Sequence, residues 1–134
     1  MSVIKEIDSI IDWYRKNYAG ASLHHLMDAK SKLLALCYTF SEETASSKRD
    51  SIIATVLRKA EHHKIKSQLI EEGFAIGKAE SKSIEQTAED MRLEAEHEAL
   101  AYKTKLVLDI ALRISEDLTQ RISVLKAEFN DKLR

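Results

Sequence analysis

The sequence predicts an all-α protein, a long antiparallel helical hairpin of coiled-coil-like type with a short N-terminal helix packed on its open end. The chain of 134 residues has no Pro and only 3 Gly, while 44% of it is hydrophobic and 32% charged. This composition disfavours sheets, which need turn residues, and disorder, which needs low hydrophobicity. Apolar residues also recur at helical spacing along most of the chain. We expect residues 1–134 to form a single helical domain.

The hairpin itself is predicted from one interruption between two long helix-forming runs. Gly73 and Gly77 stand between segments that contain neither Gly nor Pro. Glycine is unfavourable inside helices and common where a helix ends in a left-handed turn. We therefore expect the chain to reverse there, between a helix over about 22–72 and a helix over about 78–130.

The second long helix carries the clearest apolar stripe. Its members lie three or four residues apart, as the buried face of an amphipathic helix requires: Val107, Ala111, Ile114, Leu118, Ile122, Leu125 and Phe129. Nearer the turn the stripe is thinner, and we expect it to continue through Ile84, Ala88, Met91, Ala95, Ala99 and Tyr102.

The first element is a short amphipathic helix over about 2–18. Its stripe comprises Ile4, Ile7, Ile11, Tyr14 and Tyr18. Ser22, which follows the break at residues 19–21, is a suitable cap for the next helix because its hydroxyl can accept a backbone N–H. The short link predicts a three-helix cluster at the open end of the hairpin.

Residues 41–51 allow two predictions, because this segment has no large apolar residue. One is a continuous, solvated helix. The other is a loop followed by a new helix that starts at Ser47 or Asp50, which makes the protein a shorter four-helix bundle.

A two-helix hairpin of this length has little core for its surface, so we expect one apolar flank to be exposed. Such flanks usually mark association. We therefore expect a homodimer or higher oligomer, or a protein partner that completes the bundle. Four side chains are predicted to lie in a helix–helix interface: Leu106, Ile110, Ile114 and Leu118.

Residues Arg58 to His63 fit the pattern Arg-x4-His and so resemble the short motif of the HEPN ribonucleases. That resemblance implies a compact, usually dimeric helical bundle. It also implies that Arg58 holds the RNA phosphate and that His63 assists proton transfer. A metal-independent ribonuclease is therefore the alternative function.

Other polar patterns are interpreted as charged helix surfaces. Glu94 and His97 have the spacing of a metal-binding pair in helical bundles, but no second pair repeats it. We expect no metal and no cofactor. The basic stretch Lys48–Lys66 is opposed in charge by Glu71, Glu72 and the region Glu89–Glu98. We therefore expect charge pairing between the arms, with direct nucleic-acid binding as the lesser alternative.

The overall charge argues against a broad nucleic-acid or lipid surface, because the formal net charge is −1. No apolar run is long enough to cross a membrane. The single cysteine, Cys37, excludes an intramolecular disulfide, and no signal peptide is recognisable at the N-terminus. We expect a cytoplasmic protein.

Four segments together resemble small all-helical accessory proteins of bacteriophages and prophages. They are Leu26–Leu33, Glu72–Ala79, Glu98–Tyr102 and Arg121–Lys126. The resemblance is one of pattern, and no functional residue is carried over from it. It implies a protein that acts by binding. The apolar stripe is also longer than one chain can cover, and no chemical site lies beside it. The leading prediction is therefore a non-enzymatic interaction or adaptor protein of phage or prophage origin, with a protein or nucleoprotein partner.

Overall fold

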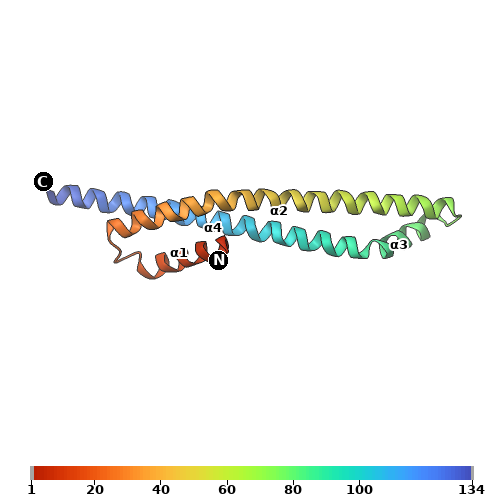
Figure 1. Cartoon of the computed structure of the whole chain (residues 1–134), viewed down its shortest axis with the longest axis horizontal. Helices are drawn as coiled ribbons and strands as arrows, with labels where there is room; N and C mark the ends of the chain where they lie inside the picture. Colours follow the sequence, from red (N-terminus) through yellow and green to blue (C-terminus); the bar gives the residue numbers. More distant parts are fainter. Residues whose placement is uncertain (1, 134) are drawn as a thin grey trace. The chain divides into compact units, whose positions relative to one another are not determined.

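The computed structural model describes residues 2–133, which form four helices and no strand. These are α1 (Val3–Asn17), α2 (Leu23–Glu71), α3 (Ile76–Gln86) and α4 (Ala88–Leu133). The contacts divide the chain into two compact units. Unit 1 contains the described residues up to Thr44 and from Thr104 onwards, and unit 2 contains Ala45–Lys103. In each unit α2 and α4 run antiparallel and pack against each other (Figure 1), which confirms the predicted all-α helical hairpin.

The segment 41–51 is helical throughout, because α2 runs from Leu23 to Glu71 without a break. The continuous alternative is therefore confirmed and the loop alternative is wrong. The polar side chains of this segment fit a helix locally: the Thr44 hydroxyl donates to the carbonyl of Phe40 at 3.0 Å. With no Gly or Pro in it, the segment has no residue that stops a helix.

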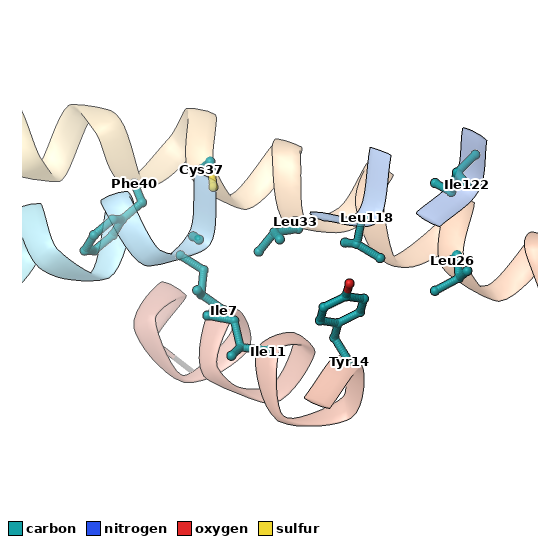
Figure 2. Close-up of a cluster of buried hydrophobic side chains, with 10 residues drawn as sticks. Ile7, Ile11, Tyr14, Leu26, Leu33, Cys37, Phe40, Leu118 and Ile122 are labelled. Atoms are coloured by element: carbon teal, nitrogen blue, oxygen red, sulfur yellow. The ribbon is translucent and has the colours of Figure 1, made fainter. Parts of the chain in front are cut away.

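The core of unit 1 is the predicted three-helix cluster. Figure 2 shows side chains of α1 pointing towards α2 and α4. The fully or almost fully buried members include Ile7, Ile11, Leu26, Leu33, Phe40, Ala111, Leu118 and Ile122. Both predicted helix starts are also capped by serine: Ser2 Oγ accepts from the N–H of Lys5, and Ser22 Oγ accepts from the N–H of His25, each at 3.3 Å.

The C-terminal end of α1 is held by α4. The Arg121 guanidinium donates to the carbonyl of Ala19 at 3.4 Å. Trp13 packs, half-buried, against the same cluster. Burial, and then the nearby Asp117 carboxylate, raises the pKa of Tyr14. Burial likewise raises the pKa of Cys37, so this thiol behaves as a small core residue.

The turn between the arms is shorter than predicted. After α2 ends, Gly73 adopts φ +99°, and the N–H groups of Gly73 and Phe74 donate to the carbonyls of Ile70 and Leu69. This is a Schellman-type helix end, in which a left-handed glycine lets the chain reverse. Gly77, by contrast, already lies inside α3, so its predicted role in the reversal is wrong.

The second arm is not one helix, as predicted over 78–130, but two. α3 and α4 are separated at Thr87, which has φ −102° and ψ 13°. The Thr87 hydroxyl donates to the carbonyl of Ser83 at 2.8 Å. Such bonds to the carbonyl four residues back often accompany a bend in a helix, and Figure 1 shows α3 turned away from the line of α4.

Candidate functional site

The helices of unit 2 meet mainly through small and polar side chains. Its buried residues are Leu69, Ala79, Ser83 and Thr87. The predicted stripe through Ile84, Met91 and Tyr102 is wrong, since these three side chains are 45, 42 and 65% exposed. The apolar side chains of this segment face outward, and polar ones take the inner positions.

Arg58 of α2 and Glu94 of α4 form an ion pair that joins the two arms. Their side chains are only 24 and 14% exposed. A second cross-arm pair joins Lys66 Nζ to Glu80 Oε2 at 2.6 Å. The predicted charge pairing between the arms is confirmed at these two places.

His62 is the centre of a second polar contact, between α2 and α3. Its Nδ1 lies 2.7 Å from the Ser83 hydroxyl, which also donates to the His62 carbonyl at 2.8 Å. Its Nε2 lies 3.2 Å from Glu80 Oε1. The hydrogen bond from Lys66 lowers the pKa of Glu80, and the charges of Lys66 and His62 lower it further. The carboxylate therefore stays ionised beside the imidazole.

A serine, a histidine and a carboxylate in contact invite comparison with a nucleophilic triad. Ser83, however, is 0% exposed and sits inside a helix. A nucleophile has to reach its substrate, and this hydroxyl is covered on every side. The contact therefore acts as a structural lock between α2 and α3.

Beside this lock lies a groove of about 600 Å³ between the α2 and α4 segments of unit 2. Its apolar lining comes from Ile53, Ala54, Leu57 and Leu93. Its polar lining comes from Asp50, Arg58, Glu61, Gln86, Asp90 and His97. We call this feature the unit 2 groove. Its lining combines apolar side chains with three carboxylates, from Asp50, Glu61 and Asp90.

The residues of the ribonuclease alternative are not brought together in this groove. Arg58 lines it and also a smaller cavity of about 200 Å³, and His63 lines neither. His63 is exposed and contacts the ring of His62 edge-on, with centroids 5.7 Å apart. The Arg58 guanidinium is occupied by Glu94.

The four side chains predicted at an interface divide between two environments. Leu118 is fully buried in the core of unit 1, and Ile114 packs partly buried against that core. Leu106 and Ile110 are 42 and 43% exposed. Only the latter two are therefore free to meet another molecule.

The sequence interpretation did not single out the unit 2 groove or the Ser83 contact. The pair Glu94 and His97 does not act together, because Glu94 binds Arg58 while His97 lines the groove. Among residues 2–133, no group of three or more His, Cys, Asp or Glu side chains is arranged to hold a metal ion.

Comparisons with protein-family models, curated proteins and solved structures found no match to this chain. Within the described part of the chain, no helix combines the length and apolar character needed to cross a membrane.

Proposed function

We propose that this protein is a non-enzymatic interaction protein that binds a protein or nucleoprotein partner through unit 2. The observation that carries the proposal is the outward placement of large apolar side chains on α2. Ile52, Ile53, Val56 and Leu57 are 56, 46, 59 and 63% exposed. Contiguous exposed apolar surface of this kind usually marks an interaction site, because covering it releases water from apolar groups.

The position of these four side chains strengthens the proposal. Successive helical residues are rotated by about 100°, so the four lie on the side of α2 roughly opposite Arg58 and His62. Those two side chains contact α4 and α3. Ile53 and Leu57 line the groove between α2 and α4, whereas Ile52 and Val56 lie outside it and are exposed, so a partner can reach them.

The basic residues of the Lys48–Lys66 stretch support a protein partner over direct nucleic-acid binding. Arg58 and Lys66 are already paired with Glu94 and Glu80. The remaining exposed bases lie among exposed apolar side chains, and apolar side chains make no favourable contact with the phosphate groups of a nucleic acid. The resemblance to bacteriophage accessory proteins is in keeping with a binding role, and we extend the proposal to that origin.

The test uses the purified chain as bait in a bacterial lysate. Val56→Asp places a charge on the apolar side of α2, and Val124→Asp is the matched control on α4, where the replaced valine is 47% exposed. We expect a discrete partner to be retained by the wild type and by the control, and lost with Val56→Asp. Retention of the same proteins by all three baits contradicts the proposal.

The same preparation distinguishes the enzyme alternative. Degradation of RNA by the purified protein, abolished by His63→Ala and by Arg58→Ala, replaces the proposal with a ribonuclease. Both variants are needed. Because His63 and Arg58 do not contact each other, loss of activity in both variants cannot come from breaking one structural contact.

A further inference from the structure

We infer that the unit 2 groove receives α2 of a second copy of this chain, while the groove of that copy receives α2 in return. The inference rests on the proposed function and names the partner of the same surface. It follows from two neighbouring features of unit 2 that complement each other in charge and in apolar character.

The first feature is the unit 2 groove, with its acidic side chains. Asp50, Glu61 and Asp90 line it, and within residues 2–133 none of the three carboxylates forms an ion pair. The one guanidinium of the groove, from Arg58, is neutralised by Glu94. The groove therefore offers unpaired negative charge beside apolar lining residues.

The second feature is the outer side of α2, which we call the basic face. Its exposed bases are Lys48, Arg49 and Lys59. Between them stand the exposed Ile52 and Val56. The only acids between residues 45 and 66 are Asp50 and Glu61, and both line the groove instead. The basic face is thus a positively charged, apolar helix surface.

The groove and the basic face adjoin along one helix, since Ile53 and Leu57, which line the groove, directly follow Ile52 and Val56 of the basic face in the sequence. When two copies meet about a two-fold axis, the basic face of each can enter the groove of the other. Such an interface is isologous and closes on itself. Opposite charges then face each other twice, and the apolar side chains of both copies are covered together.

In unit 1, a third helix covers the two long helices. There α1 lies against both α2 and α4 and buries Ile7, Ile11 and Tyr14 between them. In unit 2, α3 contributes only Gln86 to the lining of the groove, so no helix of the described chain fills it. A helix from the second copy supplies the missing layer.

The test is charge reversal followed by mixing. In the groove variant, Asp50→Lys is combined with Asp90→Lys; in the face variant, Lys48→Glu is combined with Lys59→Glu. By light scattering coupled to size exclusion, we expect the wild type to be a dimer and each variant alone to dissociate at least about tenfold more readily, because like charges then face each other. An equimolar mixture of the two variants should restore the dimer as a heterodimer.

Controls come from exposed charges of unit 1. Asp109→Lys and Lys126→Glu change the same charges outside the proposed interface and should leave the dimer intact. Circular dichroism of every variant establishes that the helices are retained. A variant that loses helicity is replaced by the corresponding neutral pair, Asp50→Asn with Asp90→Asn or Lys48→Gln with Lys59→Gln, which should weaken the dimer by a smaller factor.

Three results overturn the inference. They are a monomeric wild type, a dimer indifferent to both variants, and variants that dissociate without recovering when mixed. A monomer whose partner is still lost with Val56→Asp overturns only the second copy as occupant and leaves the proposed function standing. If the wild type is a dimer but the wild-type, Val56→Asp and Val124→Asp baits all retain the same proteins, the proposed function is overturned and the second copy remains the occupant of the groove.

Discussion

The Ser83 hydroxyl of α3 reaches both the ring and the backbone of His62 in α2, at 2.7 Å from Nδ1 and 2.8 Å from the carbonyl oxygen. Ser83 is fully buried, and so is Thr87 one turn later, whose hydroxyl donates to the Ser83 carbonyl. Short side chains let α3 approach α2 closely, while the hydroxyl satisfies polar atoms that the approach removes from water.

Replacing this serine should therefore destabilise unit 2. Ser83→Ala leaves His62 Nδ1 without its partner, and the expected loss is about 1–2 kcal/mol in the free energy of unfolding. Ser81→Ala is the matched control, because Ser81 is exposed and bonds only within its own helix. Urea unfolding followed by circular dichroism measures both. Equal effects of the two substitutions would show that the interhelical contact contributes nothing.

The Arg58–Glu94 pair should contribute more than a surface pair. A double-mutant cycle with Arg58→Met and Glu94→Leu is expected to give a coupling energy of about 1–3 kcal/mol, because both side chains are mostly buried. The same cycle on Asp28 and Lys32, which are 53 and 66% exposed, should give about 0.5 kcal/mol or less. The prediction fails if the two coupling energies are indistinguishable.

The two glycines of the turn should respond in opposite directions to alanine. Gly73 has φ +99°, so Gly73→Ala forces a strained left-handed conformation and should destabilise by about 1 kcal/mol. Gly77 is helical, and nothing lies within 4 Å of an added Cβ. Gly77→Ala should therefore stabilise by about 0.4–1 kcal/mol. Thermal unfolding of both variants checks the signs, and the same sign for both contradicts the assignment.

Acid should weaken unit 2 through Glu80. Its pKa is lowered, first by the hydrogen bond from Lys66, so the folded state holds this carboxylate ionised more strongly than the unfolded state does. The resulting stability is present above about pH 4.3, the ordinary pKa of glutamate, and is lost as the pH falls through the lower folded value. Glu80→Gln should flatten the pH dependence of stability in this range. If the loss of stability at acid pH is the same in Glu80→Gln as in the wild type, Glu80 is not its source.

The hairpin and the core of unit 1 were predictable because large apolar residues recur there at helical spacing in three segments. Leu118 and Ile122 on α4 pack in one buried cluster with Leu26 and Leu33 on α2 and Ile11 on α1. Burial of such side chains dominates the free energy of folding, so the periodicity of the sequence and the packing of the structure agree.

The arrangement of unit 2 was not predictable in the same way. Half of the apolar pattern from Ile84 to Tyr102 is alanine, and the longer side chains of Arg58 and Glu94 form an ion pair between the arms. Periodicity counts apolar residues, and it does not register which polar partners stand opposite on another helix. For this reason the pattern predicted the wrong inner face.

The helix break at Thr87 also cannot be predicted from the local sequence alone. Ser9, Thr39, Thr44 and Thr119 make the same bond to the carbonyl four residues back, and their helices continue. Thr87 differs because it is almost fully buried next to the Ser83 contact. The break therefore depends on tertiary packing, which the local sequence does not contain.

The only tryptophan of the chain, Trp13, lies on α1 against the core of unit 1, and unit 2 contains none. Intrinsic tryptophan fluorescence therefore reports on one unit alone, whereas far-ultraviolet ellipticity reports on the helices of both. The native chain thus carries a built-in optical probe. Comparing its two signals during denaturation reveals, without any added label, whether the two units melt as one cooperative system.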